Sequence, residues 1–345
     1  MSEATFVYYG GVEGGASNTK FALVRSDGMV LSSSEGEGTN PYMIGLEECL
    51  KRIEALVKEG LKNAGLPSDT ILEGLGMSLS GGDEKFMQEK ILTTMKSQYA
   101  SLTQHTFVGS DTKSALATAL PQGGIVLIAG TGSNCQLINS DGTMARCGGW
   151  GHMIGDEASA CWISLKAVKT FFDHEDGLVL SKHSVEAVRN TIFKFFKIED
   201  RGDMLDHLYK NFDKSKFSRL CKELAEVGLQ QGDPLCCQIF EEAGRQLGLH
   251  LCAIAHQIGS DLKTRDGGLP VVCVGSVFKS WKLLEPGFIE CMRSQASQTS
   301  IREVTLLSLT KDASIGAAAL GARAASKILP LDYAGNANVF YTAKF

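Results

Sequence analysis

Residues 125–142 read Ile-Val-Leu-Ile-Ala-Gly-Thr-Gly-Ser-Asn-Cys-Gln-Leu-Ile-Asn-Ser-Asp-Gly, and this stretch decides the fold. An apolar run typical of a β-strand enters a glycine turn that carries hydroxyl groups, and a second apolar run leads to Ser140-Asp141-Gly142. Asp-Gly between two such runs is a strong hairpin signal, because it tolerates the positive φ of a tight turn. The stretch therefore predicts a strand, a hydroxyl-bearing glycine turn, a second strand and a hairpin turn.

The same pattern opens the chain. Phe6-Val7-Tyr8-Tyr9 leads into a glycine-rich turn that ends at Ser17, and after a second apolar run the next Ser-Asp-Gly turn begins at Ser26. Ser17 precedes Ser26 by nine residues, and Thr131 precedes Ser140 by the same number. Because both the order and the spacing are repeated, the sequence predicts one structural unit used twice.

Strand and helix patterns alternate through the rest of the chain. Helical spacing begins at Leu46, and small-residue helices are expected at 114–120 and 313–325. Other helix candidates lie at 84–95, 158–172, 184–196, 217–229 and 234–258, and strand candidates at 75–79, 106–108, 271–274 and 304–309. This alternation, with a hairpin at the start of each half, is typical of mixed sheets covered by helices.

We therefore expect an α/β protein of two domains, which the length of 345 residues also favours. The boundary is expected at Pro121-Gln122-Gly123-Gly124. Residues 1–120 would form a small N-terminal domain, joined by the C-terminal segment 326–345, and residues 121–325 a large domain.

Composition narrows the class of protein. Hydrophobic residues make up 43% of the chain, charged residues 21%, and the net charge is −5. Because no basic run is present, nucleic acid and membrane surfaces are not expected partners. No apolar stretch approaches the roughly 18–20 residues of a membrane span, and Met1–Thr5 lacks the features of a secretory signal. Ten cysteines without a CxxC pair indicate reduced thiols, so we expect a cytoplasmic enzyme.

Two glycine turns have the residues that a phosphate-binding loop needs. Gly14-Gly15-Ala16-Ser17 and Gly130-Thr131-Gly132-Ser133 each follow a strand, and their glycines let backbone N–H groups approach a polyanion. One such turn is more often a tight bend, but two at equivalent positions favour a triphosphate held between two domains. The P-loop motif and the protein-kinase H-R-D and D-F-G motifs are absent from the sequence.

Asp111 is the candidate general base. It follows the predicted strand at 106–108 through Gly109-Ser110 and precedes a helix, and α/β sheets place ligands at the carboxyl ends of strands. A carboxylate there can orient an attacking hydroxyl and accept its proton. The alternative is that Asp111 only caps the helix that follows.

The run Cys147-Gly148-Gly149-Trp150-Gly151-His152-Met153-Ile154-Gly155-Asp156-Glu157 predicts a binding loop for a polyhydroxyl ligand. Its glycines expose backbone groups, and Asp156 can accept hydrogen bonds from two hydroxyls; the alternative is that Asp156 caps the next helix. His152 and Cys147 are too few for a zinc site. Farther along, Gly275-Ser276 after a buried strand can admit adenine and its ribose, or is a plain strand-to-helix turn.

With these motifs assembled, the chain resembles the N-acetylglucosamine kinases of the BadF-type ATPase group, within the actin/hexokinase/Hsp70 superfamily. The resemblance covers essentially the whole chain. It rests on Gly-Gly-Val-Glu-Gly-Gly at 10–15, Gly-Thr-Asn at 38–40, Ser-Leu-Ser-Gly-Gly-Asp at 78–83, Gly-Thr-Gly-Ser-Asn-Cys at 130–135, Cys-Gly-Gly-Trp-Gly-His-Met at 147–153, Gly-Asp-Glu at 155–157, Gln-Gln-Gly-Asp-Pro at 230–234 and Val-Gly-Ser-Val at 274–277.

The resemblance implies a duplicated actin-like (ribonuclease H-like) ATPase fold whose two domains flank a cleft. It also implies ATP-dependent phosphorylation of N-acetyl-D-glucosamine at the 6-hydroxyl, with Mg²⁺-ATP as co-substrate, and a homodimer. By resemblance Asp111 is the catalytic base. The implied nucleotide contacts are Gly14, Gly15, Ser17, Thr131, Gly132, Gly275 and Lys279, and the implied sugar contacts are Asn40, Asp111, Ser133, Asn134, Gly149, Trp150, Gly151 and Asp156.

The chain departs from the family pattern at one phosphate turn. The family usually has Gly-Gly-Gly-Thr where this sequence has Gly14-Gly15-Ala16-Ser17. Ser17 keeps the hydroxyl, but Ala16 adds a Cβ that costs about 1 kcal/mol if the position requires positive φ. Glu13 stands where many superfamily members have Asp, as it does in this kinase group.

Three other functions are compatible with such a fold. An actin-like ATPase module would regulate a partner protein by opening and closing, a related kinase would act on another amino sugar, and a sugar sensor would keep the fold without catalysis. Asp111 together with both phosphate turns favours a kinase over a sensor. Sugar-dependent release of ADP separates these functions, because a module hydrolyses ATP without sugar and a sensor does not release ADP.

Overall fold

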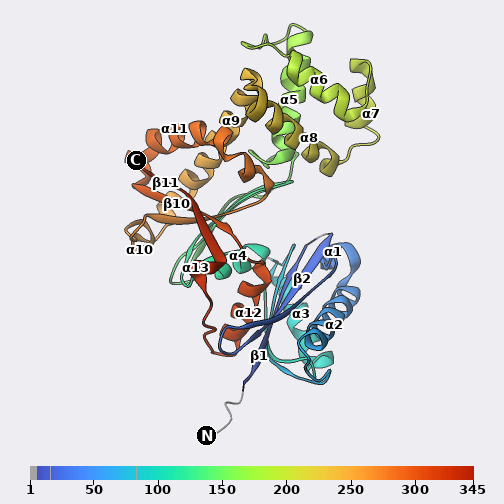
Figure 1. The fold of residues 1–345 in the computed structure, drawn as a ribbon, viewed down its shortest axis with the longest axis vertical. Helices are drawn as coiled ribbons and strands as arrows, with labels where there is room; N and C mark the ends of the chain where they lie inside the picture. The colour runs from blue at the N-terminus through green and yellow to red at the C-terminus, as the bar shows by residue number, and fades with distance from the viewer. Residues whose placement is uncertain (1–5, 16, 83) are drawn as a thin grey trace. The chain divides into compact units, whose positions relative to one another are not determined.

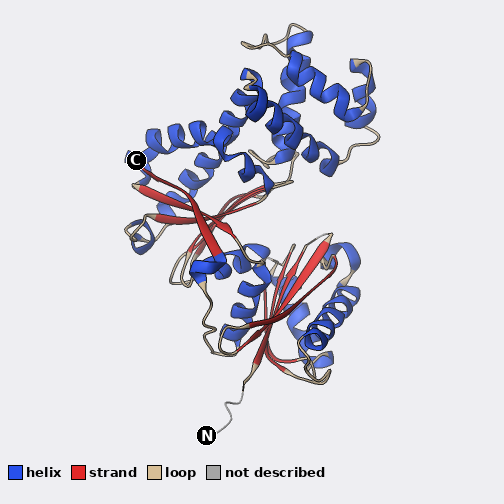
Figure 2. Ribbon diagram, in the orientation of Figure 1, coloured by secondary structure: helices blue, strands red, loops and turns tan. Residues whose placement is uncertain are grey.

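The computed structural model describes residues 6–15, 17–82 and 84–345. Ala16, for which a cost in the phosphate turn was predicted, and Asp83 therefore lie outside the described residues. The chain divides into two compact units, which we call unit 1 (residues 1–123 and 307–340) and unit 2 (residues 124–306 and 341–345). Figures 1 and 2 show the α/β character of both units, which confirms the predicted class.

Unit 1 contains a five-stranded sheet in the order β3-β2-β1-β4-β5. The β1–β2 and β2–β3 pairs are antiparallel, whereas β1–β4 and β4–β5 are parallel. The strands are β1 (Tyr8–Gly14), β2 (Asn18–Arg25), β3 (Val30–Glu37), β4 (Leu72–Leu79) and β5 (Thr103–Gly109). The helices are α1 (Pro41–Ile44), α2 (Leu46–Asn63), α3 (Lys85–Gln98), α4 (Asp111–Ala119), α12 (Ala313–Ala324) and α13 (Tyr333–Asn336).

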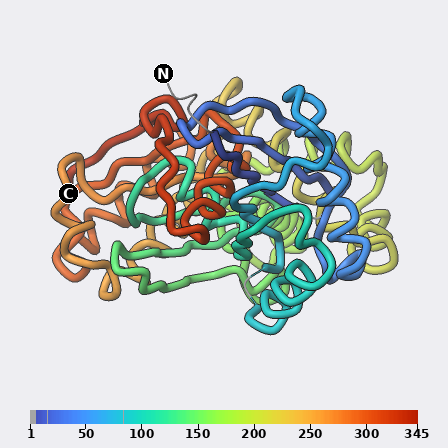
Figure 3. The backbone as a smooth tube through the Cα atoms, turned by 90° about the horizontal axis from the view of Figure 1, so that it is seen from below, coloured from blue at the N-terminus to red at the C-terminus, as the bar shows by residue number. Residues whose placement is uncertain are grey.

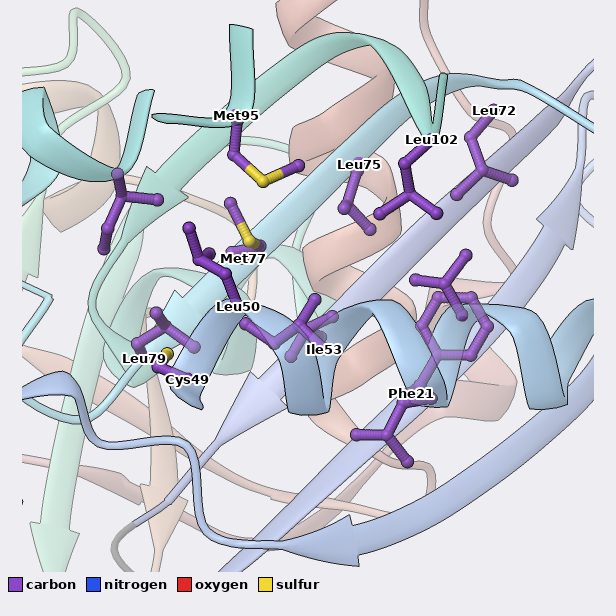
Figure 4. Packing of buried hydrophobic residues seen from close by; sticks show 14 of the residues in the cluster. Phe21, Cys49, Leu50, Ile53, Leu72, Leu75, Met77, Leu79, Met95 and Leu102 are labelled. Carbon is purple, nitrogen blue, oxygen red and sulfur yellow. The ribbon is translucent and has the colours of Figure 1, made fainter. Parts of the chain in front are cut away.

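A hydrophobic core joins α2 and α3 to one face of this sheet. Leu50 and Ile53 recur at helical spacing on α2 and are at most 1% exposed. They share one buried cluster with Phe21 of β2 and Met77 of β4, as Figure 4 shows. The apolar spacing that predicted a helix from Leu46 is therefore the spacing that fills this core.

Small residues let α12 approach the opposite face of the sheet closely. An added Cβ at Gly11 of β1 would lie 1.9 Å from the carbonyl oxygen of Ser314, and one at Gly76 of β4 would lie 1.8 Å from that of Ala317. Figure 3 shows α12, near the red end of the chain, beside the blue N-terminal strands. The structure thus places α12 in unit 1, whereas the predicted limits of 121–325 assigned it to the second domain.

We expect Gly76→Ala to destabilise unit 1 by about 3 kcal/mol, because the methyl group meets backbone rather than a side chain that can rotate away. Urea denaturation of the intact chain measures this loss. The control is Gly65→Ala, where φ is +70° but the added Cβ meets no described atom within 4 Å, so the loss should be about 1 kcal/mol. Equal losses for the two variants would show that the packing of α12 does not depend on this contact.

The second sheet repeats the topology of the first. Its order is β11-β10-β9-β6-β7-β8, so that β8-β7-β6-β9 corresponds to β3-β2-β1-β4, with β6–β7 and β7–β8 antiparallel and β6–β9 parallel. The duplication predicted from two glycine turns is confirmed. The strands are β6 (Gly124–Ala129), β7 (Ser133–Ile138), β8 (Met144–Gly148), β9 (Leu269–Val274), β10 (Glu303–Leu309) and β11 (Ala337–Lys344).

Most of the helical structure belongs to unit 2. Its helices are α5 (Ala160–Glu175), α6 (Glu186–Phe196), α7 (Met204–Leu208), α8 (Lys214–Glu226), α9 (Pro234–Ile254), α10 (Ser260–Lys263) and α11 (Trp281–Thr299). A π-helical turn, Val227–Gln231, follows α8, and 3₁₀ turns lie at Arg201–Asp203, Ala255–Gln257 and Ser276–Ser280. None of the helices in the described ranges combines the length and apolar character that crossing a bilayer takes.

Candidate functional site

The phosphate turn of unit 1 joins β1 to β2. The carbonyl oxygen of Gly14 accepts the N–H of Ser80 at 2.7 Å, and that of Gly15 accepts the N–H of Thr39 at 3.1 Å. An added Cβ at Gly14 would lie 2.2 Å from Oγ1 of Thr39, so the glycine is needed for packing whether or not it also meets a phosphate. Ser17 is exposed, which leaves its hydroxyl accessible to a ligand.

Three carboxyl groups and one ammonium group gather beside this turn. Glu13 of β1 lies opposite Lys20 of β2, and the Lys20 ammonium donates to Oδ2 of Asp312 at 2.8 Å. The pKa of Glu13 is raised to about 7. Burial is the largest cause, the hydrogen bond and charge of the Asp312 carboxyl come second, and the charge of Asp111 contributes as well. The cluster therefore places the candidate base near an acid that gains a proton easily.

The raised pKa of Glu13 predicts a pH-dependent stability. Between pH 4.5 and 7 the folded state holds a proton that the unfolded state has released, so the free energy of unfolding should fall by about 2 to 3 kcal/mol as pH rises through this range, and level off above it. Denaturation curves across pH 4 to 8 should lose this slope in Glu13→Gln. Glu35→Gln is the control, because Glu35 is exposed and 3.9 Å from the same lysine; an unchanged slope in Glu13→Gln would contradict the assignment.

Asp111 is the first residue of α4. Ser110, not Asp111, occupies the N-cap position, so the structure does not support the alternative of a simple helix cap. A carboxylate in the first turn is stabilised by the positive end of the helix dipole. The strand β5 ends at Gly109, so the position at the carboxyl end of a strand, predicted from the sequence, is confirmed. Its catalytic role stays a prediction.

In unit 2, the second glycine turn is tied to the loop that precedes α5. The N–H of Gly130 donates to the carbonyl oxygen of Gly132 at 2.9 Å, which closes the turn, and the N–H of Ala160 donates to the carbonyl oxygen of Gly130 at 2.8 Å. Ser133 donates its hydroxyl to the carbonyl oxygen of Glu157 at 2.7 Å. The predicted phosphate turn at 130–133 is therefore hydrogen-bonded to the predicted polyhydroxyl-binding loop at 147–157, which we call the sugar loop, and to the start of α5 that follows it.

Asp156 is the best-defined functional candidate in that loop. It is 3% exposed and adopts a φ of +63°. One carboxylate oxygen accepts the N–H of Ser133 at 3.2 Å, and the other accepts the ammonium of Lys214 at 2.7 Å. The alternative of an N-cap role is not supported, because Ser159 caps α5 by accepting the N–H of Trp162. A strained, buried and paired carboxylate is typical of a functional site.

The loop glycines have unusual backbone angles, and a buried side-chain acceptor lies beside the loop on β7. Gly148, Gly149 and Gly151 have φ of +83°, +76° and +82°, which side chains rarely adopt. Oδ1 of Asn134, on β7, is buried and has no hydrogen-bond partner among the described residues. An unpaired buried acceptor costs free energy unless a ligand or water satisfies it, so Asn134 fits a ligand-binding role. Trp150 is exposed, with the Arg146 guanidinium 4.4 Å from its ring centroid.

A pocket of about 730 Å³ opens next to the second glycine turn. Thr131 and Lys279, both predicted nucleotide contacts, line it. Gly275, with φ of +117°, borders this region, and an added Cβ there would lie 2.2 Å from the carbonyl oxygen of Ala129. Ser276, which the sequence suggested could lie beside the adenine, also lines the pocket. The remaining lining residues were missed by the sequence interpretation: Ala160, Phe195, Ser215, Ser218, Arg219, Cys221, Lys222, Glu223, Ala225, Glu226, Leu229, Val277 and Ser280.

A polar stripe on α8 was the missed signal. Ser215, Ser218, Arg219 and Lys222 recur at helical spacing, as a helix face toward a polar ligand would. The π-helical turn after α8 supplies Leu229 to the same pocket, and such turns are frequent at functional sites. The helix predicted at 217–229 began three residues too late, so Lys214 and Ser215 fell outside it.

Two other residues singled out in the sequence have structural roles. Asn40, a predicted sugar contact, caps α1 by accepting the N–H of Tyr42 at 2.9 Å. His152, which with Cys147 gave too few ligands for a zinc site, stacks on Phe212 with ring centroids 5.1 Å apart. The structure thus groups Gly132, Ser133 and Asp156, and separately Thr131 with Lys279, whereas Asn40 and Asp111 belong to unit 1.

Known proteins share both the sequence pattern and the fold. An N-acetylmuramic acid/N-acetylglucosamine kinase of Clostridium acetobutylicum is 25% identical over 90% of this chain and 96% of the relative. An N-acetyl-D-glucosamine kinase of Dictyostelium discoideum is 24% identical over 93% of this chain and 98% of the relative. The crystal structure of a protein with a proposed N-acetylglucosamine kinase activity from Chromobacterium violaceum has a TM-score of 0.68, is 24% identical, and matches 91% of this chain and 98% of its own.

The family assignment follows from a match that spans most of both units. The model of the BadF/BadG/BcrA/BcrD ATPase family matches residues 11–321, which include both glycine turns, Asp111, the sugar loop and α12. This chain belongs to the BadF/BadG/BcrA/BcrD ATPase family.

Proposed function

We propose that this protein transfers the γ-phosphate of Mg²⁺-ATP to the 6-hydroxyl of N-acetyl-D-glucosamine. The observation that carries the proposal lies in unit 2, where the 130–133 turn contacts both the candidate sugar-binding carboxylate and the candidate nucleotide pocket. Ser133 of the 130–133 turn donates its N–H to the buried carboxylate of Asp156, and Thr131 of the same turn lines the 730 Å³ pocket. A sugar acceptor and a nucleotide donor would therefore share one rigid element.

The pocket supplies the nucleotide side of the proposal. Its volume of about 730 Å³ lies within the usual range of ligand sites, about 300 to 1,000 Å³. Lys279 and Arg219 offer positive charge, and Ser218 and Thr131 offer hydroxyls. These groups suit a phosphorylated ligand with polar edges, and we propose that it binds the adenosine and phosphates of ATP.

The sugar loop supplies the acceptor side. A carboxylate has about four lone-pair sites, and the N–H of Ser133 and the ammonium of Lys214 use two of those of Asp156, so two remain that can accept sugar hydroxyls. Asn134 offers a buried acceptor, and the backbone of Gly149 to Gly151 can approach a ligand closely. N-acetylglucosamine has the hydroxyl and amide donors that such acceptors bind, and the two kinases that resemble this chain are named for this sugar.

Asp111 is the proposed base. It would accept the proton of the sugar 6-hydroxyl while the bond from O6 to the γ-phosphorus forms and the bond from that phosphorus to the β,γ-bridging oxygen breaks, releasing ADP. Positioning and charge stabilisation then provide most of the acceleration.

Two further candidates remain testable. N-acetylmuramic acid appears in the name of one relative, so a second amino sugar is a specific alternative acceptor. An ATPase module that drives a partner is the alternative from another class. Use of Mg²⁺, a homodimer and a cytoplasmic location stay predictions.

A sugar panel tests the proposal. Purified protein is given Mg²⁺-ATP with N-acetylglucosamine, N-acetylmannosamine, glucosamine or N-acetylmuramic acid, and ADP release is followed by an enzyme-coupled assay. We expect release to depend on sugar, with the highest kcat/KM for N-acetylglucosamine. ADP release that is the same without sugar would instead support the ATPase module.

A further inference from the structure

One cation in unit 2 contacts the sugar loop from a distant part of the chain. Lys214, the first residue of α8, donates to Oδ2 of Asp156 at 2.7 Å, although 58 residues separate them. The Asp156 side chain is 5% exposed and that of Lys214 is 31% exposed. A buried carboxylate is costly without an opposite charge, and this ammonium supplies one.

We propose that Lys214 is a positioning residue that holds Asp156 in the orientation that binds the sugar hydroxyls. The proposal rests on the proposed function. Asp156 has a φ of +63°, a conformation that the surrounding structure must enforce. The N–H of Ser133 fixes one carboxylate oxygen and Lys214 fixes the other, so that the carboxylate cannot rotate and its remaining lone pairs keep their direction.

The local structure holds Lys214 firmly in place. Asp213 caps α8 by accepting the N–H of Ser215 at 2.8 Å, and the Ser218 hydroxyl donates to the carbonyl oxygen of Lys214 at 2.8 Å. A cation at the N-terminus of a helix opposes the helix dipole, so Lys214 does not serve the stability of α8 itself. The ion pair with Asp156 therefore explains the position of Lys214 at the start of α8.

The same helix reaches the proposed nucleotide pocket. Ser215 and Ser218 line that pocket, one residue and one helical turn after Lys214. Asp156 and the nucleotide pocket are therefore joined through α8 as well as through the 130–133 turn. A change of Lys214 should consequently weaken sugar binding first, while the pocket, whose lining excludes Lys214, keeps its shape.

The test compares Lys214→Met with Lys214→Arg in the intact protein. Methionine keeps the apolar stem without the charge, and arginine keeps the charge. We expect Lys214→Met to raise the KM for N-acetylglucosamine by about tenfold to a hundredfold, with the KM for ATP changed by less than about threefold. Lys214→Arg should recover part of the loss. Lys216→Met is the matched control and should behave as wild type. Lys216 lies two residues further along α8, with its Nζ 3.3 Å from Nδ1 of His207.

A double-mutant cycle separates positioning from a general structural role. If Lys214 acts through Asp156, Lys214→Met should raise the sugar KM in wild type but add less than about threefold in an Asp156→Asn background. Full additivity, equal losses for sugar and ATP, or an unchanged sugar KM in Lys214→Met would overturn the proposal. If wild type itself shows no sugar-dependent ADP release, the proposed function fails and this inference fails with it; an active wild type with an unaffected Lys214→Met overturns the inference alone.

Discussion

An Asp111→Asn variant should lose about a thousandfold or more in kcat for N-acetylglucosamine. Asparagine has nearly the shape of aspartate and retains an acceptor, but it cannot take the proton of the sugar 6-hydroxyl. Asp111 does not line the nucleotide pocket and asparagine keeps the size of the side chain, so the dissociation constant for ATP should change by less than about threefold. Single-turnover transfer and equilibrium ATP binding measure the two effects separately.

Two further variants, Asp111→Glu and Thr112→Ser, are compared with Asp111→Asn. Glutamate keeps a base at a displaced position and should restore little, because misplacement by about 1 Å can cost a hundredfold. Thr112→Ser should retain near-normal turnover, because serine keeps the hydroxyl at this neighbouring position. In the wild type, Oγ1 of Thr112 lies 2.7 Å from Oγ of Ser110. Turnover in Asp111→Asn within about tenfold of wild type would remove Asp111 as the base.

Asp156→Asn carries the second large effect. Two hydrogen bonds from sugar hydroxyls to a carboxylate contribute about 3 to 4 kcal/mol, so kcat/KM for the sugar should fall by about a hundredfold to a thousandfold. The change should appear mainly in the sugar KM, since Asp156 does not line the nucleotide pocket. The substitution also leaves Lys214 without its counter-charge, so a loss of thermal stability is expected.

The stability loss and the binding loss can be told apart. Saturating ATP should protect Asp156→Asn against thermal unfolding as much as it protects wild type, because the nucleotide pocket stays intact. N-acetylglucosamine should protect wild type but not the variant. Protection of the variant by sugar equal to that of wild type would show that Asp156 does not bind the acceptor.

The duplication was predictable because short turn motifs, which depend only on neighbouring residues, mark it in both halves. Each Ser-Asp-Gly turn has a glycine at positive φ, +88° at Gly28 and +86° at Gly142, and each follows a hydroxyl-bearing glycine turn at the same spacing. The apolar face of α2 followed from its periodicity. Most strands followed from apolar runs next to turn signals, whereas β8 and β11 were not predicted. Asp111 could be placed because the end of a strand and the start of a helix are adjacent in sequence.

Other features depend on partners that are remote in the sequence. The helix α11 escaped prediction because Pro286 lies inside it, and Gly287 in that helix packs against the backbone of Glu241 in α9. The assignment of α12 to the first sheet depends on Gly11 and Gly76, whose close approach to its backbone no local pattern indicates.

Within the site, the sequence indicated residues but not their partners. Asp156 was a candidate from its loop, whereas Lys214 lies on another helix and had no motif to mark it. The polar stripe on α8 was visible at helical spacing, but nothing in the sequence placed it beside Thr131. Such contacts come from tertiary packing, which single-sequence periodicity does not encode.

The most direct test of the account is the structure of the product. The protein is incubated with Mg²⁺-ATP and N-acetylglucosamine, and phosphorus–proton correlation NMR identifies the atom that carries the new phosphate. The account predicts N-acetylglucosamine 6-phosphate, formed in a one-to-one ratio with ADP. Stoichiometric ADP with inorganic phosphate and unmodified sugar would contradict it.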